Sequence, residues 1–366
     1  MILTVIFYIF VASTAIQVIY LLCFSSVFFT KNLKKEDVSI PISVIICAKN
    51  EAKNLQEFLP IITNQNYSNY EIVLINDAST DETLEVMTSF KELHPKIKIV
   101  NVKNNEAFWG NKKYALTLGI KAATYKHLLL TDADCKPLSN LWIQNMANQF
   151  SEEKSIVLGY GKYKVKSSFV NLLVRFETLL TALQYFTYAK MGSPYMGVGR
   201  NLAYTKDEFF KTNGFINHMQ VKSGDDDLFI QEAATKSNTT TSLNSMSFTE
   251  SNPPTTLKEW FRQKRRHVST ASHYKFKHKF FLGLFYFTKL TFYSLIIPLF
   301  FLANWKIMIL ITTIYFILLF VIYGSATKRF QEKRLIFFLP FLEVFLLLFQ
   351  FTIFISNTIS KPTHWK

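Results

Sequence analysis

The chain has 366 residues, a formal net charge of +15 and three cysteines. A strongly basic chain can bind nucleic acid, but much of the excess charge here flanks long apolar segments, where anionic lipid headgroups attract lysine and arginine. We therefore expect membrane lipids, and no nucleic acid, among its partners. The cysteines lack the spacing of metal ligands and suit a reducing cytosol, so we expect no disulfide.

Both ends of the chain contain segments that are apolar enough to cross a membrane. A helix needs about 20 apolar residues to span the hydrocarbon core. Residues 1–30 contain no charged side chain and no signal-peptide cleavage site follows them, so we expect a retained N-terminal transmembrane anchor. Residues 280–358 predict three C-terminal transmembrane helices, at 281–304, 307–327 and 335–356.

Basic residues flank these segments on one side. Lysine and arginine near the end of a span resist translocation and stay in the cytosol. Four spans with both termini outside would place every basic cluster in the cytosol. We therefore expect an integral protein of the plasma or inner membrane whose central domain is cytosolic. The clusters are Lys31, Lys34 and Lys35; Lys275, Lys277 and Lys279; and Lys328, Arg329, Lys333 and Arg334.

Two ionisable residues lie within the expected spans. Such residues are costly in a membrane and usually find partners. Lys289 and Glu343 each lie about nine or ten positions beyond a basic flank, which corresponds to a depth of roughly 14 Å in a helix. We predict that they contact each other, directly or through a polar neighbour. The alternative is that Lys289 extends to the interface while Glu343 stays protonated beside Pro340.

Residues 38–272 have the mixed polarity of a soluble domain. Apolar runs at 42–46, 71–75, 97–102 and 127–130 are typical of buried parallel strands. Ser79-Thr-Asp-Glu82 matches a capping box that would open a helix reaching about Leu93, and 111–123 has apolar residues at helical spacing. The alternation of strands and helices predicts an α/β domain with a mainly parallel sheet.

Polar residues follow three of the predicted strands. Ligands of such sheets bind at the carboxyl ends of the strands, where the sequence places Ala48–Glu51, Asn76–Asp77 and Asp132–Asp134. Asp132 and Asp134 are suited to hold a hard divalent cation that also accepts phosphate oxygens. The alternative is an acidic turn that caps the next segment.

Five motifs in this domain occur in a fixed order. Together they resemble the family 2 glycosyltransferases, which have a GT-A fold, over about residues 40–270. The resemblance implies a Rossmann-like α/β domain with a mixed, mainly parallel sheet, a UDP- or GDP-linked sugar donor, and Mg²⁺ or Mn²⁺ as cofactor. The motifs are Ile-Cys-Ala-Lys-Asn-Glu-Ala-Lys-Asn-Leu (46–55), Asn-Asp-Ala-Ser-Thr-Asp (76–81), Lys-Lys-Tyr-Ala-Leu (112–116), Thr-Asp-Ala-Asp (131–134) and Gly-Asp-Asp-Asp-Leu (224–228).

The resemblance also implies roles for individual residues of the donor site. Asp77 and Glu51 would line the pocket of the nucleotide base, with Lys112 nearby. Asp132 would face the ribose or the diphosphate, and Asp134 the metal. The alternative for Lys112 and its neighbour Lys113 is a solvated helix face.

The acidic run at 225–227 would supply the general base. We prefer Asp226 and keep Asp225 as the second candidate, because three consecutive aspartates leave the register open. The alternative is that the run is an exposed helix cap.

A basic segment from Trp260 to His267 follows. Processive relatives, such as cellulose- and hyaluronan-type synthases, carry Gln-x-x-Arg-Trp at this place. Gln263 and Arg266 match this signature and would contact the donor, whereas His267 replaces the tryptophan and puts processivity in doubt. A juxtamembrane patch that binds lipid is the alternative.

Two further segments bear on the acceptor. Residues 169–190 are apolar and carry two charges, which favours either an amphipathic helix at the cytosolic interface or a core helix. The loop 197–201 resembles the acceptor-side loop of the family and contains Arg200 and Asn201; His267 would also lie on the acceptor side.

The leading hypothesis is an inverting, metal-dependent transfer of a sugar to a lipid-linked or membrane-bound acceptor at the cytosolic face. A processive polysaccharide synthase is the alternative within the enzymes. A nucleotide-binding transport or scaffold protein without catalysis is the alternative from another class, and it would tolerate loss of the acidic run.

Overall fold

The computed structural model describes residues 1–29, 39–103, 112–221 and 223–360. The chain divides into two compact units. The helical unit combines Met1–Lys31, Ser167–Thr187 and Thr255–His364, and the α/β unit combines Asn32–Lys166 and Tyr188–Pro254, together with the last two residues. The basic cluster Lys31, Lys34 and Lys35 and the first residue of the expected helix, Asn111, lie outside the described residues.

A seven-stranded sheet forms the centre of the α/β unit in its described residues, with the strand order β3-β2-β1-β4-β8-β6-β9. The first four strands along the chain are mutually parallel, and β8 runs antiparallel to both its neighbours. The prediction of a mainly parallel α/β sheet is therefore confirmed. The strands are β1 (Ile42–Ala48), β2 (Tyr70–Asp77), β3 (Ile97–Val102), β4 (His127–Asp132), β6 (Ile156–Leu158), β8 (Leu202–Thr205) and β9 (Thr239–Thr241).

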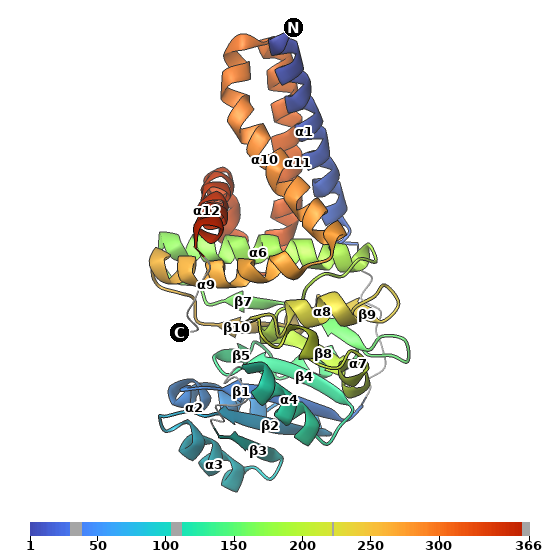
Figure 1. The fold of residues 1–366 in the computed structure, drawn as a ribbon, viewed down its shortest axis with the longest axis vertical. Coiled ribbons are helices and arrows are strands. Elements are labelled where there is room, and N and C mark those ends of the chain that lie inside the picture. The colour runs from blue at the N-terminus through green and yellow to red at the C-terminus, as the bar shows by residue number, and fades with distance from the viewer. Residues whose placement is uncertain (30–38, 104–111, 222, 361–366) are drawn as a thin grey trace. The chain divides into compact units, whose positions relative to one another are not determined.

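Helices and a small second sheet complete this unit (Figure 1). The small sheet has the order β5-β10-β7 among the described residues. Its strands are β5 (Cys135–Pro137), β7 (Gly161–Tyr163) and β10 (Thr249–Ser251). The helices are α2 (Ala52–Thr63), α3 (Thr83–Leu93), α4 (Lys112–Ala122), α5 (Trp142–Ala147), α7 (Lys206–Lys211) and α8 (Asp227–Ala233), and a 3-10 turn, η2, spans Gly199–Asn201.

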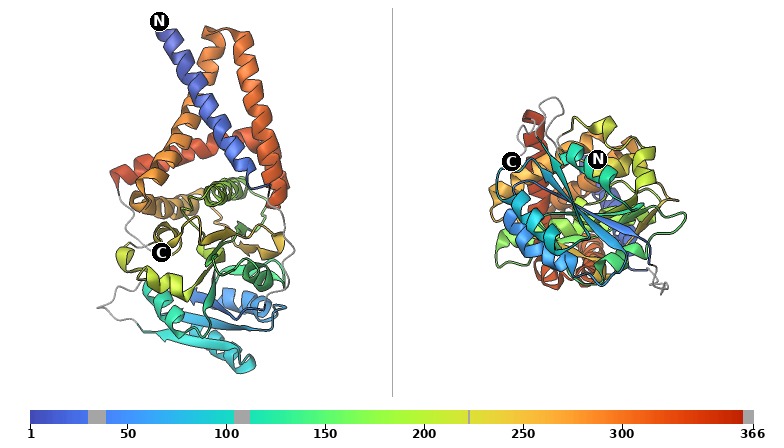
Figure 2. Two further views of the ribbon diagram at one scale, coloured as in Figure 1. Left: turned by 90° about the vertical axis from the view of Figure 1, so that its right-hand side faces the viewer. Right: turned by 90° about the horizontal axis from the view of Figure 1, so that it is seen from below.

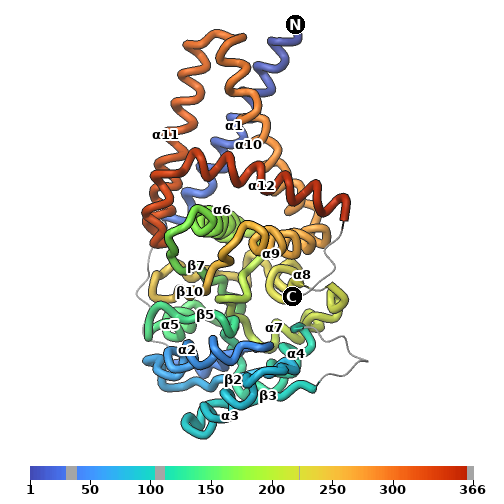
Figure 3. Tube along the Cα trace, turned by 90° about the vertical axis from the view of Figure 1, so that its left-hand side faces the viewer, coloured from blue at the N-terminus to red at the C-terminus, as the bar shows by residue number. Residues whose placement is uncertain are grey.

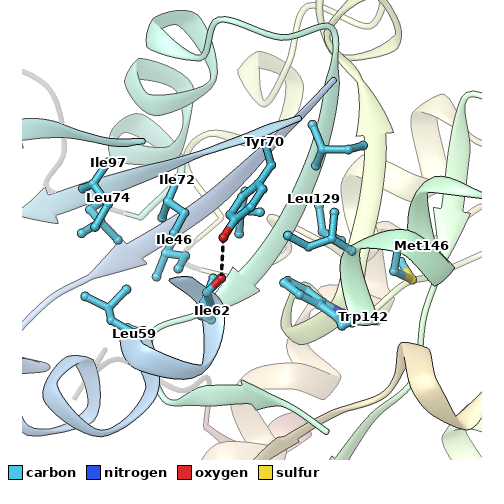
Figure 4. Packing of buried hydrophobic residues seen from close by; sticks show 14 of the residues in the cluster. Ile46, Leu59, Ile62, Tyr70, Ile72, Leu74, Ile97, Leu129, Trp142 and Met146 are labelled. Carbon is cyan, nitrogen blue, oxygen red and sulfur yellow. Dashed lines mark hydrogen bonds between the residues drawn. The ribbon is translucent and has the colours of Figure 1, made fainter. Parts of the chain in front are cut away.

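The core of the α/β unit lies between the sheet and the helices packed on it (Figure 4). Strands buried on both faces read as continuous apolar runs, and β1 is buried along nearly its whole length. Side chains of α2, including Leu59 and Ile62, pack against this sheet. The hydroxyl of Tyr70 also donates a hydrogen bond to the carbonyl of Ile62, at 3.3 Å. This core holds the carboxyl ends of the strands in a fixed register.

The predicted capping box at 79–82 is wrong. Helix α3 begins at Thr83, and its N-cap residue Glu82 makes no side-chain capping bond. Ser79 and Asp81 instead accept hydrogen bonds from backbone N–H groups of the loop after β1: Asn50 donates to Ser79 Oγ at 3.0 Å, and Ala52 donates to Asp81 Oδ2 at 3.4 Å. Asp81 also accepts the N–H of Thr83, the first residue of α3, at 3.1 Å. The motif therefore joins the start of α3 to the segment that follows β1.

The helical unit contains, within its described residues, four helices that are long and apolar enough to cross a membrane. They match the predicted arrangement of one N-terminal and three C-terminal segments. Two of these helices, α1 and α10, are joined by a hydrogen bond: the amide of Gln17 on α1 donates to Thr288 Oγ1 on α10 at 2.7 Å. The four are α1 (Ile2–Ser25), α10 (Phe276–Leu302), α11 (Trp305–Arg329) and the segment Lys333–Ile359, which comprises the 3-10 turn η6 (Lys333–Phe338) and α12 (Leu339–Ile359).

Two shorter helices, α6 (Phe169–Lys190) and α9 (Leu257–Ser269), belong largely to the helical unit rather than to the domain of residues 38–272 that the sequence predicts. Their contacts explain this grouping. Phe176 of α6 stacks on Tyr323 of α11, with ring centroids 5.8 Å apart. Lys264 of α9 forms a salt bridge of 2.6 Å with Glu177 of α6. Helix α6 is therefore a buried helix that packs against the apolar segments.

The expected contact between Lys289 and Glu343 is confirmed. Lys289 Nζ lies 2.5 Å from Glu343 Oε1, and both side chains are almost fully buried. The hydroxyl of Tyr293 donates a second hydrogen bond to Glu343, at 3.0 Å. The alternative in which Lys289 extends away to the interface is therefore wrong, because its ammonium group has a buried anionic partner.

Candidate donor and metal site

The acidic residues lie at the carboxyl edge of the parallel strands. Strand β1 lies between β2 and β4, and its last residues pair with Asn76 on one side and with Asp132 on the other. Asp77 is the last residue of β2, and Asp132 is the last residue of β4. The register thus places the two carboxylates on either side of the end of β1, as the sequence predicts.

Lys112, the first residue of α4, joins two of the acidic motifs. Its Nζ lies 2.7 Å from Asp132 Oδ1 and 2.8 Å from Asp225 Oδ2. Burial opposes the charged lysine, but these two carboxylates raise its pKa well above the usual value. Although burial opposes the charged carboxylate of Asp225 too, Lys112 holds the pKa of Asp225 below its usual value. Lys112 is therefore part of the site and does not lie on a solvated helix face.

Lys113 is a supporting residue that the sequence analysis missed. Its side chain is buried, so the alternative of a solvated helix face is wrong for this residue also. Its Nζ donates hydrogen bonds to the carbonyls of His218 at 2.7 Å and of Val221 at 2.9 Å. Burial lowers the pKa of Lys113 to about 8. Lys113 therefore anchors the segment that precedes the acidic run, and the only sequence signal was its place beside Lys112.

Asp132, Asp134 and Cys135 have ligand atoms that all lie within 4.8 Å of one another. Burial, and then the nearby Asp132 carboxylate, raise the pKa of Asp134, and the charge of Glu51 contributes in the same direction. Burial also raises the pKa of the Cys135 thiol well above its usual value, which keeps it protonated and unsuited to bind metal. The two carboxylates remain, and carboxylate oxygens are what Mg²⁺ and Mn²⁺ prefer. The residues therefore fit a hard divalent cation.

The three aspartates of the acidic run have different partners. Asp225 pairs with Lys112. Asp226 accepts the Gly199 N–H at 2.7 Å through one oxygen and the Asp227 N–H at 2.8 Å through the other, so it caps α8. Asp227 is buried and accepts the N–H of Leu228 at 2.8 Å. The run is thus a helix cap, as the alternative supposed, but its side chains are not exposed.

Asp226 differs from Asp225 in its protonation. Burial, and then the charges of Asp225 and Asp227, raise the pKa of Asp226 to about 7. A general base works best when its pKa lies near the operating pH. Asp226 therefore has the electrostatic environment of a base, and Asp225 that of a permanently charged partner of Lys112.

The loop at η2 contacts the acidic run, because the N–H of Gly199 donates a hydrogen bond to Asp226. Its next residue, Arg200, donates to Ser251 Oγ at 3.0 Å, and its guanidinium lies 4.3 Å from the centroid of the Tyr163 ring. Burial disfavours the charged guanidinium, yet the pKa of Arg200 is raised by nearby groups that include Asp134. Arg200 therefore places a fixed positive charge near the candidate metal ligands.

Asn201 has a structural role. Its side chain is fully buried, and its amide donates to the carbonyls of Tyr160 at 3.0 Å and Ser247 at 2.7 Å. Its oxygen accepts the indole N–H of Trp142 at 3.1 Å. These bonds hold the loop in place and leave the side chain no access to an acceptor, in contrast to its expected place on the acceptor side.

Asp77 and Glu51, the predicted contacts of the nucleotide base, lie at the last residue of β2 and just before α2, respectively. Burial raises the pKa of Asp77, while Lys49 and Lys112 act in the opposite direction. Glu51 accepts a hydrogen bond of 2.6 Å from the Asn54 amide, and its N–H donates to Thr83 Oγ1 at 2.9 Å. These contacts position Glu51, whereas Asp77 is placed at the edge of the sheet by the end of β2.

Three other predicted residues lie outside the α/β unit. Gln263, Arg266 and His267 are on α9, which belongs to the helical unit. The site described above contains none of them among its described contacts. Their roles towards donor and acceptor therefore stay predictions.

The sequence was compared with models of known protein families. The model named Glycosyl transferase family 2 matches residues 43–204, and the model named Glycosyl transferase family group 2 matches residues 130–328, which is more than half of the chain. The chain belongs to the family 2 glycosyltransferases. The five motifs that carry the acidic edge of the sheet all lie within the matched regions.

This glycosyltransferase is also similar to individual curated proteins. It is 32% identical over 148 residues to an uncharacterised glycosyltransferase of Haemophilus influenzae, covering 40% of this chain and 42% of that protein. It is 36% identical over 93 residues to a poly-beta-1,6-N-acetyl-D-glucosamine synthase of Staphylococcus epidermidis, covering 25% of this chain and 21% of the synthase. The matched region thus spans less than half the length of these curated relatives.

One solved structure resembles nearly the whole glycosyltransferase. It is the mannosyltransferase PcManGT from Pyrobaculum calidifontis, in complex with GDP-Man and Mn²⁺. The TM-score is 0.60 at 16% sequence identity, and the match covers 95% of this chain and 99% of the mannosyltransferase. At this identity the likeness concerns the fold, which is GT-A with apolar helices.

Proposed function

We propose that this glycosyltransferase transfers a sugar, with inversion at the anomeric carbon and with the help of a divalent cation, from a UDP- or GDP-linked donor to a lipid-linked or membrane-bound acceptor at the cytosolic face. The observation that carries the proposal is the convergence of Asp132, Asp134 and the 225–227 run at one edge of the sheet, joined through Lys112. Each group has a distinct part in such a reaction.

Asp134, with Asp132 beside it, would hold Mg²⁺ or Mn²⁺. A bound cation stabilises the negative charge that develops on the departing nucleoside diphosphate. The mannosyltransferase of similar fold was solved with Mn²⁺, which supports a metal at this edge. Lys112 and Arg200 add positive charge to the same region and would orient the diphosphate through charge-assisted hydrogen bonds.

Asp226 would remove the proton from the acceptor hydroxyl as that oxygen attacks the anomeric carbon. The attack comes from the side opposite the leaving diphosphate, so a single displacement inverts the configuration. A carboxylate offers about four lone-pair positions, and the N–H groups of Gly199 and Asp227 occupy two of them. Asp226 is therefore held in place and can still accept a proton.

Residues that the sequence analysis predicts as donor contacts would bind the rest of the donor. Asp77 and Glu51 would line the pocket of the base, and Gln263 and Arg266 would reach the diphosphate. The acceptor is proposed to be lipid-linked because four helices of the described chain are apolar enough to span a membrane. The basic flanks of these helices favour a cytosolic catalytic domain in the plasma or inner membrane.

A processive polysaccharide synthase is the second candidate. The similarity to the poly-N-acetylglucosamine synthase favours it, whereas His267 in place of the tryptophan of processive relatives argues against it. A transport or scaffold protein without catalysis is disfavoured, since the complete set of acidic residues is present at one edge. Product length, measured with purified protein, separates single from repeated addition.

The test is an assay of the full chain in detergent with a panel of nucleotide sugars and either Mg²⁺ or Mn²⁺, following the nucleoside diphosphate released. We expect one donor to be used, and Asp134→Ala to reduce transfer by roughly two to three orders of magnitude, as loss of a main electrostatic group does. Asp207→Ala, a substitution at an exposed aspartate of α7, is the matched control. Transfer that survives excess chelator would refute the metal requirement.

A further inference from the structure

Helix α12 runs across the other long apolar helices instead of alongside them. In Figure 3, α1, α10 and α11 extend along one direction, and α12 extends across it. Figure 1 shows the same helix nearly end-on, and the left view of Figure 2 shows it crossing between the others. All these helices belong to the helical unit, so this crossing is a property of one compact body.

The C-terminal end of α12 is bound to α9. Arg265 of α9 donates to Asn357 Oδ1 at 2.8 Å and to the Ser356 carbonyl at 3.1 Å. It also donates to the carbonyl of Ser360, and to the Ser360 hydroxyl at 3.0 Å. The Asn357 amide in turn donates to the Arg265 carbonyl at 3.1 Å. The Ser356 carbonyl also accepts the N–H of Ser360, whereas the Ser360 carbonyl is one that the end of the helix leaves without an intrahelical partner.

The rest of α12 is bound to the same helices. The ring of Phe349 stacks on the indole of Trp260 of α9, with centroids 4.0 Å apart. Phe345 contacts the ring of Phe169, at the start of α6, with centroids 5.4 Å apart. The segment that leads into α12 is bound there too, because Arg175 of α6 donates to the Glu332 carboxylate at 2.7 Å. Helices α6 and α9 therefore contact α12 along most of its length.

These contacts restrict where the two ends of α12 lie. Helices α10 and α11 are joined by the short turn 303–304, so the start of α10 and the end of α11 lie at the same face of a membrane that both cross. Helix α12 begins just after α11, and its other end is bound to α9, which ends a few residues before α10 begins. Both ends of α12 therefore lie at that face.

A membrane-spanning α12 is incompatible with this arrangement. The helix has 21 residues, which corresponds to a length of about 31 Å. The hydrocarbon core is also about 30 Å thick. If α12 crossed it, the Ser356–Ser360 end would lie at the opposite face, roughly 30 Å from α9. The hydrogen bonds of Arg265 would then be impossible.

The side of α12 that faces away from α6 and α9 is apolar. The one charged residue of helix α12, Glu343, does not lie on this side, because it is buried and paired with Lys289. An apolar surface of this length, continuous with three apolar helices, is unfavourable in water but matches lipid chains. The exposed large apolar side chains of α12 are Phe341, Val344, Leu348, Phe351, Phe354, Ile355 and Ile359.

We propose that α12 lies in the plane of the membrane, at the face where α10 begins and α11 ends, with its exposed apolar side in the acyl chains of the lipids. The described part of the chain then crosses the membrane three times, and the Ser360 end of α12 lies on the side of the basic clusters that flank α10 and α11. The four-span topology predicted from hydropathy places the C-terminus on the opposite side. Helices α6 and α9 support α12 from beneath, and Arg265 holds its far end.

Cysteine labelling of the full chain in intact cells tests the topology with a membrane-impermeant maleimide. Three variants are compared with the unsubstituted chain: Lys306→Cys in the α10–α11 turn region, Lys279→Cys at the start of α10, and Lys366→Cys at the C-terminus. We expect Lys366→Cys to behave like Lys279→Cys, with labelling only after permeabilisation, and Lys306→Cys to be labelled from outside. Labelling of Lys366→Cys from outside, like Lys306→Cys, would overturn the proposal.

Spin labels give a second measurement that does not depend on the terminus. Labels are placed singly at Phe341, Leu348 and Ile359 of the full chain in vesicles of phosphatidylethanolamine and phosphatidylglycerol, and their depth is read from collisions with oxygen and with a polar nickel complex. An in-plane helix gives similar depths at all three positions. A spanning helix gives its greatest depth near Leu348 and two shallow ends, which would overturn the proposal.

The Arg265 contact is tested in the same labelled protein. Arg265→Met should increase the mobility of a label at Ile359 while leaving a label at Phe341 unchanged. Arg262→Met, on the same helix with an exposed side chain, is the matched control and should alter neither. Equal mobility of the Ile359 label in all three proteins would refute the role of Arg265.

Discussion

Lys112 and Asp225 form an ion pair of 2.8 Å across the carboxyl edge of the sheet. The lysine begins α4 and the aspartate precedes α8, so the pair joins two motifs that are far apart in the sequence. The same ammonium group also binds Asp132 at 2.7 Å. Lys112 thus connects the predicted metal side of the site with the predicted base.

Replacing Lys112 by Met should leave Asp132 and Asp225 facing each other without a cation. Charge-assisted hydrogen bonds of this kind contribute about 1.5–3 kcal/mol each, so we expect transfer to fall by roughly 10- to 100-fold. Steady-state transfer and thermal unfolding are measured together. Lys121→Met, at the exposed end of the same helix, should keep full activity. An unchanged rate in Lys112→Met would show that the lysine has no part in catalysis.

The two candidate bases should respond differently to amidation. Asp226→Asn keeps the size of the side chain but removes the proton acceptor, so transfer should fall by about 10²- to 10⁴-fold while donor binding persists. Asp225→Asn should weaken donor binding, because Lys112 loses an anionic partner. Nucleotide titration of purified protein, together with kcat and KM, separates the effects. The reverse pattern would assign the base to Asp225.

The raised pKa of Asp226, about 7, predicts a pH profile. A base works only when deprotonated, so transfer should be low well below that pKa and should rise as the pH increases through about 7. After burial, the charge of Asp225 contributes most to raising this pKa, so Asp225→Asn should move the rise to lower pH. The measurement is kcat/KM against pH, which reports the free enzyme. A flat profile between roughly pH 5.5 and 8.5 would exclude Asp226 with this pKa.

Lys289 and Glu343 should be energetically coupled. Each single replacement, Lys289→Met or Glu343→Gln, leaves a buried partner without its counter-charge, which typically costs about 3–5 kcal/mol. The double variant should cost less than the sum, with a coupling of roughly 0.5–3 kcal/mol. Unfolding of the three variants in one detergent measures this. Strict additivity would mean that the observed contact contributes nothing to stability.

Local patterns in the sequence were enough to predict the elements of the α/β unit and the four apolar segments. Hydropathy and periodicity are properties of neighbouring residues, so β1 to β4, α4 and the membrane segments could be predicted without knowledge of their packing. The order of the five motifs was enough to indicate the family. The Lys289–Glu343 contact could also be predicted, because a charge within an apolar helix needs a partner.

What depended on residues distant in the sequence was decided only by the tertiary structure. Ser79 accepts the N–H of Asn50 in the loop after β1 instead of capping α3, while Asp81 binds both Ala52 and Thr83, the first residue of α3. The side chain of Asn201 is hydrogen-bonded to the indole of Trp142 and to two backbone carbonyls. Asp225 and Asp226 differ in their partners, because Asp225 pairs with Lys112 and Asp226 accepts the N–H of Gly199. Hydropathy alone makes α12 a span, whereas Arg265 binds its far end at the face where it began. Composition measures how apolar a helix is, but its direction is set by the partners that its ends find in the folded chain.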